Sequence, residues 1–103
     1  MPVTADVQAA ISRRYIALTD SITHGHEDAE RAMLAPHFSD HAKLKLSIYE
    51  YDPLTVLMQK MSMSGNTLIV HVQYVGVGKR RENAIDRWTL IDGVWKLLDR
   101  SKG

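Results

Sequence analysis

Apolar residues near the start of the chain recur at the spacing of an amphipathic helix. Thr4 can cap this helix, and the apolar positions that follow share one face: Val7, Ile11, Tyr15, Leu18 and Ile22. Gly25 is a typical helix stop, and the acidic residues that follow it suit the positive N-terminus of a second, shorter helix from Glu27 to about Ala35. Pro36 ends that helix, so the pattern predicts two N-terminal helices.

From residue 42 onward the period of the pattern falls from 3.6 to 2. Apolar and polar residues alternate between Ala42 and Tyr49, which predicts a half-buried strand. Residues 54–63 fit either a strand or a short helix, residues 67–77 fit a strand, and the closing segment predicts two more strands joined at Asp92-Gly93. Two helices followed by three or four strands predict one α+β domain over residues 1–103, with the N-terminal helices on one face of a curved antiparallel sheet.

Asp92-Gly93, between strand-forming residues, is the strongest local signal for a two-residue type I′ turn. Regular pairing outward from this turn places six residues on the drier face of the hairpin: Leu90, Trp95, Trp88, Leu97, Asp86 and Asp99. Both tryptophans are therefore predicted to pack in the core beneath the helices. The same register predicts that Asp86 lies opposite Asp99.

Two carboxylates that face each other across a strand pair repel, and this leaves two interpretations open. In a partly dry site, one aspartate would keep its proton to a higher pH than a free side chain does, and a protonated acid in an apolar cavity can take part in catalysis. Alternatively, both carboxylates lie at the open end of the sheet and are neutralised by Arg87, Arg100 or the basic residues 79–81.

The order of these segments resembles the nuclear transport factor 2-like superfamily, which has a cystatin-like fold and includes ketosteroid isomerases and polyketide cyclases. The resemblance covers nearly the whole chain and is carried by "RRYIALTDSITHG", "FSDHAKLKL" and "DRWTLIDGVWKLLDR". In ketosteroid isomerase, a helix tyrosine and a protonated aspartic acid hydrogen-bond the developing enolate oxygen. The resemblance implies these two roles for Tyr15 and Asp86, whereas Leu44 or Leu46 occupies the place of the isomerase's basic aspartate.

These observations predict that a small apolar or aromatic molecule binds in a cavity between the helices and the sheet. The candidate catalytic residues are Tyr15, Asp86 and Asp99, and the candidate ligand contacts are Tyr15, Leu46, Tyr49, Trp88 and Trp95. If the protein turns over a substrate, the reaction would be an isomerase-, cyclase- or dehydratase-like proton transfer, in which Tyr15 and Asp86 stabilise an oxyanion. The alternative is a structural or dimerisation module whose own side chains fill its core.

Composition narrows the classes of partner. A net charge of +1 provides no strong field for nucleic acid or an anionic membrane, and no segment approaches the roughly 20 apolar residues that span a bilayer. The histidines fit no established zinc pattern and there is no cysteine, so we expect neither a metal nor another cofactor. With no leader recognised, the chain is predicted to be cytoplasmic. His71 and Gln73, on the polar side of their strand, favour a homodimer formed through the outer face of the sheet.

Overall fold

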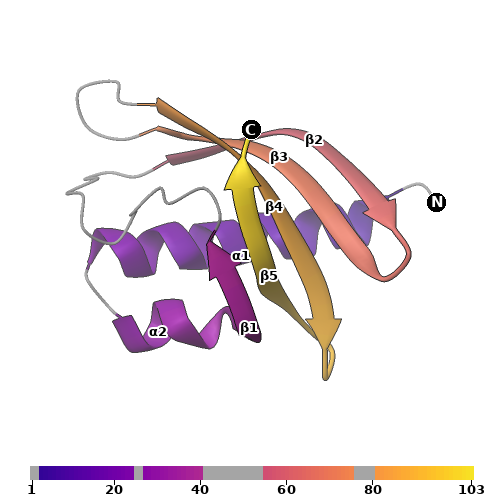
Figure 1. Ribbon diagram of the computed structural model, residues 1–103, viewed down its shortest axis with the longest axis horizontal. Helices are drawn as coiled ribbons and strands as arrows, with labels where there is room; N and C mark the ends of the chain where they lie inside the picture. Colours follow the sequence, from indigo (N-terminus) through magenta and orange to yellow (C-terminus); the bar gives the residue numbers. More distant parts are fainter. Residues whose placement is uncertain (1–2, 25–26, 41–54, 76–80) are drawn as a thin grey trace.

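The computed structural model describes residues 3–24, 27–40, 55–75 and 81–103 as a layer of helices against a curved sheet (Figure 1). The two described helices are α1 (Ala5–Thr23) and α2 (Glu27–Ala32). The described strands are β1 (Leu34–Asp40), β2 (Thr55–Ser64), β3 (Thr67–Val75), β4 (Arg81–Ile91) and β5 (Val94–Lys102). They lie in the order β1-β5-β4-β3-β2. The predicted α+β fold is confirmed, although the sheet is mixed, because β1 pairs with β5 in parallel.

Helix α1 forms where the apolar period predicts it. The Thr4 hydroxyl caps the helix by accepting a hydrogen bond from the backbone N–H of Val7 at 3.2 Å. Ile11, Tyr15 and Leu18 are at most 3% exposed, so the predicted apolar stripe is the face that packs on the sheet. Within the described part of the chain, no helix combines the length and the apolar character needed to cross a bilayer.

Helix α2 ends at Ala32, earlier than the sequence predicts, because β5 draws the following residues into the sheet. The backbone N–H of Leu97 donates to the carbonyl of Met33 at 2.8 Å, and the Lys96 ammonium donates to the carbonyl of Ala32. Residues 34–40 then pair with β5 as an edge strand, a position in which Pro36 is tolerated. The strand predicted from Ala42 lies outside the described residues.

The strands that follow build the face of the sheet that packs on α1. Residues 55–64, ambiguous in sequence, form a strand that pairs with β3 and joins it through a two-residue turn in which Gly65 has a φ of 60°. On β3 every second residue is buried, as the alternation predicts. The main core lies between this face and α1, and its largest buried side chains are Trp88, Tyr74, Ile11, Leu18, Leu68 and Leu97.

The closing hairpin has the predicted turn. Asp92 and Gly93 have φ values of 51° and 78°, as a type I′ turn requires. The strand pairs nearest the turn also agree with the prediction: Ile91 with Val94, Leu90 with Trp95, and Trp88 with Leu97. Trp88 is fully buried, whereas Leu90 is 53% exposed because it lies near the tip of the hairpin.

Farther from the turn, a β-bulge changes the pairing. The register shifts between Trp88 and Arg87, so that Arg87 lies opposite Asp99 and Asp86 lies opposite Arg100. The predicted pairing of Asp86 with Asp99 is therefore wrong. One extra residue in β5 moves Asp99 to the other face of the sheet, because side chains alternate between faces at every residue of a strand.

Candidate functional site

A fully buried carboxylate, that of Asp86, lies beneath α1 and accepts three hydrogen bonds. The hydroxyls of Tyr15 and Tyr74 both donate to Oδ2, at 2.6 and 2.5 Å. Arg100 donates through Nε to Oδ1 at 3.0 Å, and its side chain is only 7% exposed. The buried negative charge is thus paired with a buried positive charge and held by two further donors.

The same side chains also bond to one another. Trp88 donates through Nε1 to the Tyr15 hydroxyl at 3.0 Å, and Arg100 donates through Nη2 to the Tyr74 hydroxyl at 2.9 Å. The rings of Tyr15 and Trp88 meet edge to face with their centroids 5.1 Å apart, and the guanidinium of Arg100 lies 5.0 Å from the centroid of the Tyr74 ring. We call these five residues, with Asp86 at their centre, the buried network. Each of its two hydroxyls donates its single proton to Asp86 and accepts one hydrogen bond.

Burial changes the ionisation of the buried network. Desolvation raises the pKa of Tyr15 well above the ordinary value of a tyrosine, and the fields of Tyr74 and Asp86 add to this. Desolvation likewise raises the pKa of Tyr74, and Asp86 adds to this effect while Arg100 opposes it. For Arg100, burial by itself would lower the pKa. The fields of Tyr74 and Asp86 outweigh this effect and raise the pKa above the ordinary value of an arginine. The network therefore keeps both phenols neutral and the guanidinium charged.

The predicted site residues fall into different parts of the molecule. Tyr15 and Asp86, predicted as two donors to one oxyanion, are hydrogen-bonded to each other. Asp99 lies on the opposite face of the sheet and forms an ion pair with Arg87 at 3.1 Å. Trp95 is half-buried, and its carbonyl accepts a hydrogen bond from Arg14. Leu46 and Tyr49 lie outside the described residues.

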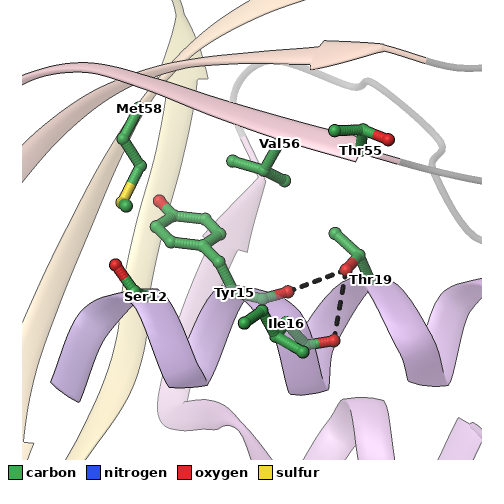
Figure 2. Close-up of a pocket in the computed structure, with 7 residues that line it drawn as sticks. All are labelled: Ser12, Tyr15, Ile16, Thr19, Thr55, Val56 and Met58. Atoms are coloured by element: carbon green, nitrogen blue, oxygen red, sulfur yellow. Dashed lines mark hydrogen bonds between the residues drawn. The ribbon is translucent and has the colours of Figure 1, made fainter. Parts of the chain in front are cut away.

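A groove separates α1 from the edge strand β2. It has a volume of about 380 Å³ and is lined by seven described residues: Ser12, Tyr15, Ile16, Thr19, Thr55, Val56 and Met58. Figure 2 shows the ring of Tyr15 rising from α1 towards β2, with Val56 and Met58 above it. The Thr19 hydroxyl donates to backbone carbonyls of its own helix turn, at 2.9 Å to Tyr15 and 3.2 Å to Ile16 (Figure 2). Apolar surface from Tyr15, Ile16, Val56 and Met58 makes up most of the groove wall.

Tyr15 joins the groove to the buried network. The residue is among those that line the groove, although it is only 3% exposed, and its hydroxyl bonds to Asp86 in the core. Trp88 lies under Tyr15 and is not among the residues that line this groove. Trp88 therefore supports the groove wall from the core. It does not line this groove, although it was predicted as a ligand contact.

Sequence reasoning missed several residues of this region. The burial of Tyr74 could have been predicted from the sequence, since Tyr74 continues the alternation of buried residues that includes Val70 and Val72. The second interpretation named Arg87 and Arg100 as cations that could neutralise the aspartates, and Arg100 pairs with Asp86 while Arg87 pairs with Asp99. Which arginine meets which aspartate depends on the bulge, for which the doublet Leu97-Leu98 is a weak signal. Apart from Tyr15, the groove residues on α1 and β2 gave no signal, because they meet only after the sheet has formed.

Comparison with solved structures identifies the fold. An NTF-2-like protein of unknown function from Silicibacter pomeroyi DSS-3 matches with a TM-score of 0.77 at 14% identity over 97% of each chain. An NTF2-like protein of unknown function from Shewanella baltica OS155 matches with a TM-score of 0.75 at 6% identity, over 100% of this chain and 97% of that one. A protein of unknown function with a cystatin-like fold from Nostoc punctiforme PCC 73102 has a TM-score of 0.67 at 14% identity, over 99% and 93% of the two chains. No protein-family model matches the chain, and no curated protein matches it in sequence.

At these identities the likeness concerns the fold. The chain has the nuclear transport factor 2-like, cystatin-like fold that its segment order resembles.

Proposed function

We propose that this protein binds a small apolar molecule in the groove between α1 and β2. The observation that carries this proposal is an apolar recess of about 380 Å³, walled by the Tyr15 ring, Ile16, Val56 and Met58. Its volume falls within the usual range of small-molecule sites, about 300 to 1,000 Å³. Binding would be driven by removal of apolar surface from water, with hydroxyls at the rim to orient the molecule.

The hydrogen bonds of Tyr15 favour binding over proton transfer. An oxyanion site needs free donors about 2.7–3.1 Å from the position of the developing charge. The Tyr15 hydroxyl donates its proton to Asp86 instead, and Asp86 accepts from Arg100. A ligand in the groove would have to break that bond, and Asp86 would have to become a donor beside a buried cation. The buried network therefore supports a role as a rigid floor for the groove.

Fluorescence of the neutral probe N-phenyl-1-naphthylamine tests this proposal. Ile16 is 68% exposed at the groove, so Ile16→Lys leaves the core intact and places a charge at the binding site. Leu90→Lys is the matched control, since Leu90 is also an exposed apolar residue (53%) but lies near the tip of the hairpin. We expect Ile16→Lys to weaken probe binding at least threefold and Leu90→Lys to leave it unchanged. Equal affinities of both variants and the parent would refute a groove site.

A second candidate function is the association of two copies through the outer face of the sheet. The strand register places Leu57, Ile69 and Ile85 on this face, and Leu57 is 46% exposed. The described helices lie on the other face (Figure 1). An apolar strip flanked by polar residues is typical of a subunit interface, so homodimerisation is compatible with ligand binding in the groove.

A further inference from the structure

A serine hydroxyl in the wall of the groove has no hydrogen-bond partner among the described residues. Ser12 is half-buried on α1 and lines the groove. Two other hydroxyls of this helix, those of Thr19 and Ser21, donate to carbonyls of the preceding turn at 2.9 and 2.7 Å. The Ser12 hydroxyl forms no such bond within the described part of the chain. Figure 2 shows its Oγ directed from α1 towards β2, so the hydroxyl is available to a molecule in the groove.

The strand register settles which side chains of β2 face Ser12. Val56 and Met58 pair with residues of β3 that are buried beneath α1, namely Tyr74 and Val72. Because side chains on paired positions point to the same face of a sheet, Val56 and Met58 point towards the helix. Figure 2 shows both side chains reaching from β2 towards α1. The wall opposite Ser12 is therefore apolar.

The other hydroxyl groups of the residues that line the groove are engaged or directed elsewhere. The Tyr15 hydroxyl donates to Asp86, and the Thr19 hydroxyl donates to carbonyls of its own helix. Thr55 lies two positions before Leu57 in a regularly paired stretch of β2, which places both on the outer face of the sheet. Among the described lining residues, Ser12 is thus the one whose hydroxyl can both donate to a ligand in the groove and accept from it.

Ser12 lies at one end of the groove. Thr19 lies at the other end, seven residues further along α1, so at about 1.5 Å per residue the groove is roughly 10 Å long. Beyond Ser12 a neighbouring recess reaches Gln8, one helical turn earlier. A molecule whose body contacts Tyr15 and Val56 would therefore present its end to the Ser12 hydroxyl.

The lining also restricts the charge and the shape of the ligand. None of the described residues that line the groove is charged, so an ionised group would lose its hydration there without gaining an opposite charge. The ring of Tyr15 and the thioether of Met58 both make favourable contacts with aromatic rings. A neutral aromatic body with one polar end matches these walls.

We infer that the ligand is an uncharged aromatic molecule with a single hydroxyl group, which forms a hydrogen bond with Ser12 while the ring lies beside Tyr15 and Met58. This inference rests on the proposed function, since it names the class of molecule that the same groove binds. Ser12 is then the residue that distinguishes a phenol from the corresponding hydrocarbon.

Competition between a matched phenol and hydrocarbon tests this inference. 4-Propylphenol and propylbenzene share one carbon skeleton and differ by a hydroxyl, and each is used to displace N-phenyl-1-naphthylamine at neutral pH, where the phenol is uncharged. We expect Ser12→Ala to lower the ratio of phenol affinity to hydrocarbon affinity about three- to tenfold, as the loss of one hydrogen bond allows. Thr19→Val removes a hydroxyl that already bonds to its own helix, so it should change both affinities alike and keep the parent's ratio.

The outcomes separate the inference from the function on which it rests. If the probe does not bind, or if Ile16→Lys leaves its affinity unchanged, the groove site itself is wrong. If the probe binds at the groove but Ser12→Ala keeps the parent's ratio, or if Thr19→Val lowers the ratio as much, the assignment of the hydroxyl to Ser12 is overturned. Displacement of the probe by 4-propylbenzoate as readily as by 4-propylphenol would overturn the uncharged class.

Discussion

Replacing Arg100 with methionine removes the cation of a buried ion pair and leaves Asp86 charged in the core. Asp86 has no exposed surface, and Arg100 supplies the hydrogen bond to Oδ1. The two tyrosine hydroxyls would remain on Oδ2, but they are dipoles and do not neutralise a full charge. Loss of one partner of such a pair costs about 3 to 5 kcal/mol. This is a large part of the roughly 5 to 15 kcal/mol that stabilises an ordinary domain, and it lowers the melting temperature by roughly 12 °C or more.

Urea unfolding followed by tryptophan fluorescence measures this effect in a double-mutant cycle. We expect Arg100→Met and Asp86→Asn each to lower the free energy of unfolding by several kcal/mol. The double variant should lose about 1 to 3 kcal/mol less than the sum, because it leaves no unpaired charge in the core.

Arg87 provides the matched control, since it pairs with Asp99 on the outer face of the same two strands. Their N–O distance is 3.1 Å, but their side chains are 41% and 24% exposed, so Arg87→Met should cost less than about 1 kcal/mol. If Arg100→Met costs no more than Arg87→Met, or if the two single effects simply add, the buried pair is not the source of stability that its geometry indicates.

Three further predictions concern the core, the pH range and the assembly. Trp88→Ala should cost about 3 to 5 kcal/mol in urea unfolding and Trp88→Phe much less, because the indole is fully buried; parent-like stability of the alanine variant would contradict this packing. Above about pH 10 the free energy of unfolding should fall. The pKa values of Tyr15 and Tyr74 are higher in the folded chain than in the unfolded chain. Each phenol therefore contributes its full stabilisation below its pKa in the unfolded chain, and this contribution is lost as the pH rises towards its pKa in the folded chain. Each phenol adds at most about 1.4 kcal/mol per pH unit to this slope, so Tyr74→Phe should flatten it, and an unchanged slope would show that Tyr74 ionises freely in the folded chain. Light scattering coupled to size exclusion should give the mass of a dimer at micromolar concentration, and a monomer mass would refute association through the sheet.

Helix α1 and the closing hairpin illustrate what a short stretch of sequence determines. The spacing of Ile11, Tyr15 and Leu18 specifies which face of α1 is buried, and Asp92-Gly93 specifies the turn and the pairs beside it. In both cases the information lies within about twenty residues, because helical periodicity and turn conformation are properties of neighbouring residues. The α+β class and the burial of Trp88 followed from these local patterns.

The end of α2 and the partner of Asp86 were decided by contacts between distant parts of the chain. The helical pattern up to Ala35 is overridden because β5 supplies hydrogen-bond partners to the residues after Ala32. A bulge one residue long changed the neighbour of Asp86 from Asp99 to Arg100, and this turned a predicted pair of repelling carboxylates into an ion pair. The register across a bulge is set by packing on both faces of a sheet, which local sequence does not encode.

The sequence by itself thus determined the amphipathic helix, the hairpin and the presence of Tyr15 and Asp86 as candidates. Only the tertiary structure decided what surrounds them. Tyr15 and Asp86 are 71 positions apart in the chain, and Arg100 and Tyr74 are 26 apart, yet they form one buried network. The groove likewise exists only where α1 lies beside the edge strand β2. Charge pairing and cavity shape depend on which side chains meet in three dimensions, and that is settled when the whole sheet closes over the helix.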